Sequence, residues 1–416
     1  MSAIGPLWRR EGRENGKSRR RCIAALAVTA LSNPQIVVLI GDGFAACAIL
    51  GCLYLSLAAI MVLRFPREES FEEIAAPVTV LKPLHGAEPG LLRRVRSCCM
   101  QNYRGEVQVV CGVRDVADPA AGQIAPIVGA QAFEIELIVN AAEHGRNRKV
   151  SNLANMLPSA RHDILVIADS DIEVEPDYLA RVVSQLHRPN VGAVTCLYHG
   201  VAAKEGWSEY AALAINGHFL PSAIFAVSFG LAQPCFGSTI ALRKSVLRGF
   251  GGFEAFADRL ADDYAIGAAV RSAGKEVSVG AFTVGHMCSI DSFRGLLSQE
   301  MRVARTIRSL DPIGYAGTFI THPFALALLS LVLGCEFGDL LAVLALACRA
   351  ALCFAVGYAF RLRPQPYWII PFRDALSFAI YAVSFFGEIV TWRGFDYRVN
   401  AEGKPAPHRA ASQRKA

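Results

Sequence analysis

The stretch "ILVIADSDIEVEPDYL", Ile164 to Leu179, runs from an apolar segment directly into a cluster of acids. The uninterrupted aliphatic run at its start is typical of a strand that is buried on both faces, as in a parallel sheet. Ligands of open α/β sheets bind outside the carboxyl ends of such strands. Asp169 and Asp171 follow the run one residue apart, so both carboxylates can reach one hard cation. The stretch therefore predicts a cation site at a sheet edge, with a diphosphate as the usual anionic partner of the cation.

The surrounding segment, residues 66–318, alternates strand and helix signals. Runs rich in β-branched residues predict strands at 78–84, 106–113, 134–139 and 163–171. Helices are predicted at 91–100 and 149–157, the second from apolar residues at helical spacing. This alternation favours an α/β domain with a mostly parallel sheet that is covered on both faces.

The composition points to a membrane protein. Of the 416 residues, 53% are hydrophobic, a high share for a soluble globular chain. The net charge of +6 is concentrated in the basic tails 1–21 and 393–416, which argues against a nucleic-acid partner and fits the basic flanks of membrane segments. The twelve cysteines form no CxxC pair, so neither a disulfide framework nor a zinc site is expected.

Two regions predict membrane segments. Residues 22–64 predict one or two spans, because 43–63 is uncharged and long enough to cross about 30 Å of hydrocarbon, whereas Asn33-Pro34 interrupts the uncharged stretch before it. Residues 319–392 predict about three transmembrane or membrane-associated helices, at 319–335, 340–360 and 375–392. Two N-terminal spans place the central domain in the cytoplasm, where nucleotide-sugars are, and a single span places it outside. We expect the cytoplasmic placement, chiefly because of the chemistry below.

Further charged residues are candidates for the same site. Asp115 closes the second predicted strand, and Asp262 and Asp263 lie in "LADDYAIG". Carboxylates at the ends of parallel strands collect at one edge, so these acids can share a site, although each alone also fits a loop acid or a helix cap. Lys149 begins a predicted helix, where an ammonium and backbone amides can converge on a phosphate; an ordinary solvated lysine is the alternative.

An Asp-x-Asp after an apolar strand also resembles the nucleophile strand of haloacid-type phosphatases. Such enzymes usually carry it on their first strand, followed by Thr or Val two residues beyond the second Asp. Here the pair follows three predicted strands, and Glu173 stands at that later position, so this alternative is disfavoured.

Several motifs in consistent order between residues 78 and 308 resemble a known family. They are "TVLKPLHGAEPGLLRRV", "GVRDVADPA", "NRKVSNLANMLP", "IADSDI", "CFGSTIALRKSVL" and "LADDYAIG". Together they resemble the ceramide glucosyltransferase family, glycosyltransferase family 21, whose members are membrane-embedded inverting enzymes with the nucleotide-diphosphate-sugar (GT-A) fold. "GGFEAFAD" and "ARTIRSLDPIGYAG" look most like its bacterial hopanoid-associated branch, thought to transfer N-acetylglucosamine to a polyhydroxylated hopanoid.

The resemblance implies a role for each acid. Asp115 matches the aspartate that faces the nucleotide base and ribose. Asp169 matches the second family aspartate, and Asp171 completes the pair that binds a divalent cation, Mg²⁺ or Mn²⁺, around the diphosphate. Asp263 matches the candidate general base, with Asp262 beside it in the catalytic pair.

Other positions are implied in the same way. Lys149 falls where the family has a basic residue near the donor, and His218, in "NGHFLPS", falls where it has an acceptor-side histidine. A single histidine such as His218 is nevertheless more often structural. Gln299 and Arg302 match the donor-side motif Q/R-x-x-R-W, but Val303 replaces its tryptophan.

Arg302, Arg305 and Arg308 recur every three residues on a predicted interfacial helix near 294–310. Their charges can neutralise a departing UDP or attract anionic lipid head groups.

The sequence thus predicts an inverting glycosyltransferase in a bacterial inner membrane, with its catalytic domain facing the cytoplasm. Its expected partners are a UDP-sugar donor (N-acetylglucosamine or glucose), the bilayer and a membrane lipid acceptor, a hopanoid polyol. The alternatives are a ceramide glucosyltransferase that makes glucosylceramide and a non-catalytic membrane scaffold, which only Val303 supports.

Overall fold

The computed structural model describes residues 33–65, 71–130 and 133–387, and the backbone of 389–392, 395–399 and 405–407. The chain divides into two compact units. The first consists of Met1–Leu55 and Ile320–Arg349, and the second consists of Ser56–Phe319 and Ala350–Ala416. Every candidate site residue lies in the second unit.

The second unit contains an eight-stranded sheet in the order β3-β2-β1-β4-β7-β6-β8-β5. Its strands are β1 (Val78–Pro83), β2 (Val107–Val113), β3 (Ile135–Val139), β4 (Ile164–Ile167), β5 (Ile172–Glu173), β6 (Val191–Ala202), β7 (Ile240–Arg243) and β8 (Glu276–Cys288). β7 and β5 run against their neighbours, and the remaining pairs are parallel. The prediction of an α/β fold with a mostly parallel sheet is confirmed.

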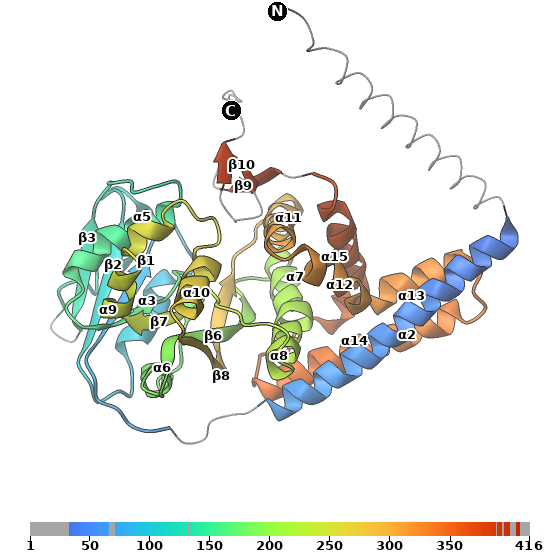
Figure 1. Ribbon diagram of the computed structural model, residues 1–416, viewed down its shortest axis with the longest axis horizontal. Helices are drawn as coiled ribbons and strands as arrows, with labels where there is room; N and C mark the ends of the chain where they lie inside the picture. The colour runs from blue at the N-terminus through green and yellow to red at the C-terminus, as the bar shows by residue number, and fades with distance from the viewer. Residues whose placement is uncertain are drawn as a thin grey trace, which may run out of the picture. The chain divides into compact units, whose positions relative to one another are not determined.

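Helices cover both faces of this sheet (Figure 1). On one face lie α3 (Leu91–Cys99), α4 (Pro119–Ile124) and α6 (Tyr178–Leu186); on the other lie α5 (Arg148–Met156), α9 (Lys244–Gly249) and α10 (Asp262–Ser272). β4 sends Ile164 and Val166 into the first core and Leu165 and Ile167 into the second. The apolar run Ile164–Ile167 is therefore continuous, because successive side chains of a strand alternate between two faces and both faces are buried here.

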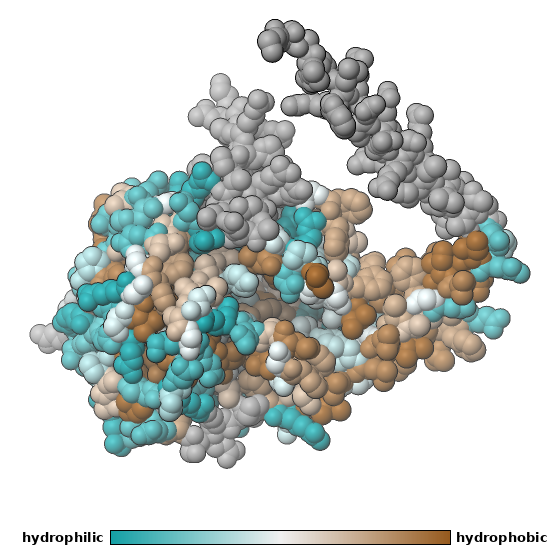
Figure 2. Space-filling view, in the orientation of Figure 1, coloured by the Kyte–Doolittle hydropathy of each residue, from teal (hydrophilic) through white to brown (hydrophobic). Residues whose placement is uncertain are grey.

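Within the described residues, three helices are long and apolar enough to cross a membrane, or four if one bent pair counts as a span. They are α2 (Pro34–Arg64), α14 (Gly338–Ala359) and the continuous stretch Trp207–Ser228, formed by α7 (Trp207–Ala214), η2 (Ile215–Phe219) and α8 (Leu220–Ser228). The bent pair is Pro312–Thr321 with α13 (Pro323–Val332), at 68°. Figure 2 shows mainly hydrophobic side chains over α2, α13 and α14.

These helices agree with most of the predicted membrane segments. α2 contains the predicted span 43–63, α14 coincides with 340–360, and the bent pair overlaps 319–335. The structure differs at 375–392, where α15 (Ile370–Ser384) ends and β9 (Ile389–Trp392) follows as a strand. The stretch Trp207–Ser228 was not predicted as a possible span. Residues 22–32 and the basic tail 1–21 lie outside the described residues.

The remaining elements complete the second unit. They are α11 (Phe293–Leu310), α12 (Pro312–Gly317), the short helices η1 (Leu157–Ser159), η3 (Phe253–Phe256) and η5 (Tyr367–Ile369), and the small sheet of β9, β10 (Phe395–Val399) and β11 (Pro405–Pro407). α11 covers the predicted interfacial helix and packs against α12 and α15.

Candidate active site

The loop after β4 carries the predicted metal-binding acids, and two buried cations hold it by its backbone. Nζ of Lys82 donates to the carbonyl oxygens of Asp169 (2.9 Å) and Ile172 (3.0 Å). Nε of Arg94 donates to the carbonyl of Ser170 (2.7 Å). Both cations are almost completely buried, so the loop is fixed from beneath by charged donors. The sequence contained a signal for this role, since Lys82 is a charged residue inside a strand that otherwise lacks charge.

Lys149 lies between acids of two different elements. Its Nζ is 2.7 Å from Oδ1 of Asp169 and 3.2 Å from Oδ2 of Asp262. The helix that carries Lys149 begins at Asn147, whose Oδ1 caps the amide of Lys149 (3.0 Å) and whose Nδ2 donates to Asp262 (3.3 Å). Burial lowers the pKa of Lys149, but Asp169 and Asp262 outweigh it and raise that pKa above its usual value. The ammonium therefore stays charged.

Asp263, in the first turn of α10, lies near Lys149 and Asp169. Its Oδ2 accepts a hydrogen bond from the backbone N–H of Gly237 (3.0 Å), and its Oδ1 accepts one from the amide of Tyr264 (2.8 Å). A Cβ on Gly237 would lie 3.4 Å from Oδ2 of Asp169, Oδ2 of Asp263 and Nζ of Lys149. The structure therefore brings these three predicted residues together around Gly237, a residue that the sequence analysis did not single out.

The acids of this cluster differ in how readily they bind a proton. Burial, with the negative charge of Asp262, raises the pKa of Asp263 to about 6. Burial also raises the pKa of Asp169, against the opposing effect of Lys149. A carboxylate with a pKa near the working pH can accept a proton and release it again, which is what a general base requires.

Asp171 is paired with a histidine that the sequence analysis missed. Oδ2 of Asp171 is 3.3 Å from Nε2 of His286, because β5 pairs with β8 in a register that sets Ile172 opposite His286. Although burial raises the pKa of Asp171, His286 lowers it overall to about 2, and the acid in turn raises the pKa of His286 well above its usual value. Oδ1 of Asp171 is buried and has no hydrogen-bond partner among the described residues.

The family model "Glycosyl transferase family 21" matches residues 43–405. The chain belongs to glycosyltransferase family 21. The resemblance predicted from the motifs is thus confirmed at the level of the family, and so is the GT-A type of fold. The hopanoid-associated branch stays a prediction.

Curated relatives are ceramide glucosyltransferases. The chain is 23% identical over 257 residues to ceramide glucosyltransferase 1 of Caenorhabditis elegans, covering 57% of this chain and 53% of the relative. It is 30% identical over 132 residues to the ceramide glucosyltransferase of Candida albicans, covering 29% and 24%. The matched regions span about half the length of these relatives or less. Among solved structures, a mannosyltransferase from Pyrobaculum calidifontis in complex with GDP-Man and Mn²⁺ is 22% identical, with a TM-score of 0.49 and coverage of 84% of this chain and 99% of that one.

The family motifs also implied donor-side roles for Asp115, Gln299 and Arg302. Asp115 is exposed just beyond β2, where its Oδ1 accepts a hydrogen bond from the amide of Ala117 (2.9 Å). It shares the carboxyl edge of the sheet with Asp169, with β1 between their strands. Gln299 and Arg302 lie on α11, and their roles at the donor, like that of Asp115, stay predictions.

His218 has a buried partner. It lies in η2, and its Nε2 is 3.0 Å from Oδ1 of Asp374 on α15. The neighbouring Arg373 makes a bidentate ion pair with Glu300 of α11, one of whose hydrogen bonds is 2.7 Å long. His218 thus belongs to a charged network inside the helical part of the second unit, and its predicted acceptor role stays open.

The donor groups of the loop fit a divalent cation only in part. Within the described residues, no three His, Cys, Asp or Glu side chains are grouped closely enough to hold a metal ion. Mg²⁺ is, however, commonly held by one or two carboxylates together with water and the phosphates of a substrate. Asp169 and the unpartnered Oδ1 of Asp171 supply such a partial set.

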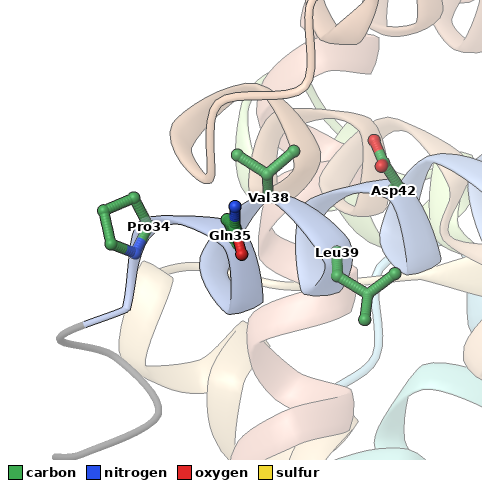
Figure 3. Close-up of a pocket in the computed structure, with 5 residues that line it drawn as sticks. All are labelled: Pro34, Gln35, Val38, Leu39 and Asp42. Carbon is green, nitrogen blue, oxygen red and sulfur yellow. The ribbon is translucent and has the colours of Figure 1, made fainter.

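One pocket lies in the first unit, which contains none of the candidate site residues. Figure 3 shows Pro34, Gln35, Val38, Leu39 and Asp42, which line it, on the first turns of α2. It holds a single charged side chain, so its lining offers no pair of groups for acid–base or metal chemistry.

Proposed function

We propose that this chain is an inverting glycosyltransferase that moves a sugar from a UDP-sugar to a hydroxyl group of a membrane lipid. The observation that carries the proposal is the convergence of Asp169, Lys149 and Asp263 around Gly237, within a chain of family 21. A cation-binding carboxylate, a phosphate-binding ammonium and a base are the groups that this reaction needs in one place.

In the proposed mechanism, Asp169 and Asp171 would hold a divalent cation, which would offset the charge on the leaving diphosphate. The ammonium of Lys149 binds a diphosphate oxygen from the same side. The carboxylate of Asp263, held by the N–H of Gly237, takes the proton from the acceptor hydroxyl as its oxygen attacks the anomeric carbon. A single displacement inverts that carbon and needs no nucleophilic residue of the protein.

The apolar helices support an acceptor that stays in the bilayer. α2, α14 and the stretch Trp207–Ser228 are each long enough to span it. We propose that the catalytic domain faces the cytoplasm at a bacterial inner membrane, where UDP-sugars are available. We also propose the predicted boundaries: membrane segments at 22–64 and 319–392 around a catalytic domain at 66–318.

For the acceptor we propose a hopanoid polyol, on the motifs of the bacterial branch. Ceramide is the second candidate, and the names of the curated relatives favour it. A non-catalytic scaffold rests only on Val303, and the two intact acids and the lysine around Gly237 speak against it.

The test is an assay with membranes that contain the protein, supplied with labelled UDP-glucose or UDP-N-acetylglucosamine and with ceramide or a hopanoid polyol. Label in one lipid product identifies both donor and acceptor, and NMR of the product reports whether the anomeric carbon is inverted. No labelled lipid from a folded preparation that binds a UDP-sugar would support the scaffold.

A further inference from the structure

Four aromatic rings lie next to the acid cluster, and none of them was predicted as a site residue. Tyr198 of β6 stacks on Phe219 of η2, with ring centroids 4.4 Å apart and an interplanar angle of 22°. Phe236 meets both rings edge-on, at 6.2 Å from Tyr198 and 5.4 Å from Phe219. The imidazole of His286 lies 5.3 Å from the ring of Tyr198. These four residues are called the aromatic platform below.

The platform is connected to the acids by one ion pair and by one chain neighbour. His286 is ion-paired with Asp171 at 3.3 Å, and Phe236 directly precedes Gly237, whose N–H binds Asp263. Tyr198 is partly exposed. Burial, with the nearby charges of Asp263 and Asp171, raises the pKa of Tyr198, so its phenol stays protonated and can donate a hydrogen bond at neutral pH.

The other side of the platform belongs to an apolar helix. Phe219 ends the π-helical turn within Trp207–Ser228, a stretch that is long and apolar enough to cross a membrane. Such turns are rare inside α-helices and are common at functional sites. The turn sets Phe219 against Tyr198, so the platform connects an apolar helix with the proposed base.

We propose that Tyr198 binds the lipid acceptor and selects acceptors that carry a second hydroxyl group next to the reacting one. The inference rests on the proposed function. The reacting oxygen gives its proton to Asp263 and an electron pair to the anomeric carbon, while the bond from that carbon to the UDP oxygen breaks. A donor on the reacting oxygen would withdraw electron density from the attack, so the phenol of Tyr198 serves better on a neighbouring oxygen. The rings of Phe219 and Phe236 pack against the apolar carbons beside these hydroxyls.

Tyr198→Phe tests the hydrogen bond, because it keeps the ring and its stacking and removes only the hydroxyl. For the lipid that the wild type glycosylates, we expect KM to rise about twofold to tenfold, as the loss of one hydrogen bond predicts. Inhibition by a long-chain alcohol with a single hydroxyl should be equal in the variant and the wild type. Binding of the UDP-sugar, measured by calorimetry, should not change.

Tyr103→Phe is the matched control. Tyr103 lies in the loop before β2, outside the candidate site, where its hydroxyl donates to the carbonyl of Ala76, and the same atom is removed. Its KM for the lipid should equal that of the wild type.

Three results would overturn the proposal: an unchanged KM for the lipid in Tyr198→Phe, an equal loss of affinity for the single-hydroxyl alcohol, or weaker binding of the UDP-sugar. Phe219→Leu gives a second check, because it removes the stacked ring but not the phenol. It should raise the KM for the lipid and weaken inhibition by the alcohol alike, and no effect on either would contradict an acceptor-binding platform. Failure of the proposed function itself would be seen earlier, as a wild type that labels no lipid.

Discussion

At the residue scale, Asp263 carries the most specific chemical assignment. Its Oδ2 is fixed by the amide of Gly237 and lies beside the ammonium of Lys149. Asp263→Asn keeps the shape of the side chain and removes its basicity. We expect transfer to fall by about 10² to 10⁴, the usual contribution of a general base, with the binding of UDP-sugar nearly unchanged. Single-turnover transfer and calorimetry measure the two effects.

The control for this variant is Asp258→Asn, because Asp258 accepts a backbone hydrogen bond from Arg146 that an asparagine can also accept. It should retain full activity. Retained turnover in Asp263→Asn would mean that another group takes the proton.

The raised pKa of Asp263 predicts a pH dependence. Because the base is active only when ionised, and its pKa lies at about 6, kcat/KM should decrease as the pH falls through about 6 and should be constant above it. The residual activity of Asp263→Asn should lack this decrease. A wild-type profile that is flat from pH 7 to pH 5 would be incompatible with the proposed base.

A substitution at Gly237 tests whether Asp169, Asp263 and Lys149 act at one common point. A methyl group there would just fit, at 3.4 Å from the polar atoms of Asp169, Asp263 and Lys149, and would fill the space at which they meet. We expect Gly237→Ala to fold with a Tm close to that of the wild type and to lose at least tenfold in transfer, since displacement of this order is costly in a preorganised site. Gly122→Ala, whose methyl group meets nothing within 4 Å, is the control and should be silent. Full activity in Gly237→Ala would show that substrates do not use this space.

At the scale of elements, four of the eight strands, β1 to β4, could be predicted from the sequence, because each is encoded locally by an apolar run. The contacts of the site could not be predicted in the same way. His286 meets Asp171 only because β8 pairs with β5, and Tyr198 meets Phe219 only because a π-helical turn packs on β6. Such pairings join segments far apart in the chain, and no local pattern encodes their register.

Lys82 makes a prediction about the acidic loop as an element. Lys82→Met would leave the carbonyls of Asp169 and Ile172 without their buried donor, at a cost of about 1–3 kcal/mol in the free energy of unfolding. Because such supporting contacts orient metal ligands, we also expect Mn²⁺ to bind about tenfold more weakly. Chemical denaturation and electron paramagnetic resonance of bound Mn²⁺ measure these effects.

Lys204→Met provides the comparison, since Lys204 is exposed and makes only a surface ion pair with Asp291. It should change neither quantity. A stable Lys82→Met protein with normal Mn²⁺ affinity would mean that the loop keeps its shape without the buried cation.

At the scale of the whole molecule, the sequence already implied a catalytic domain joined to apolar helices, because hydropathy is a property of composition. The sequence analysis did not identify Trp207–Ser228 as long and apolar enough to span a membrane. This stretch lies between strands of the sheet and was therefore assigned to the catalytic domain. The same stretch carries both His218 and Phe219. In the proposed function, an apolar helix within the domain would give a lipid acceptor a route toward the acids, which terminal spans alone would not provide.

The proposed insertion of α2 can be tested with two lysines on one helix. Leu50 is exposed near the middle of α2, and Leu39 is exposed within its first two turns. If α2 spans the bilayer, Leu50→Lys should cost about 3 kcal/mol of insertion free energy, whereas Leu39→Lys can extend its ammonium to the interface. We expect Leu50→Lys to lower the amount of protein that stays in membranes after alkaline carbonate extraction, and Leu39→Lys to leave it unchanged. Equal retention of both variants would mean that this face of α2 does not contact the hydrocarbon.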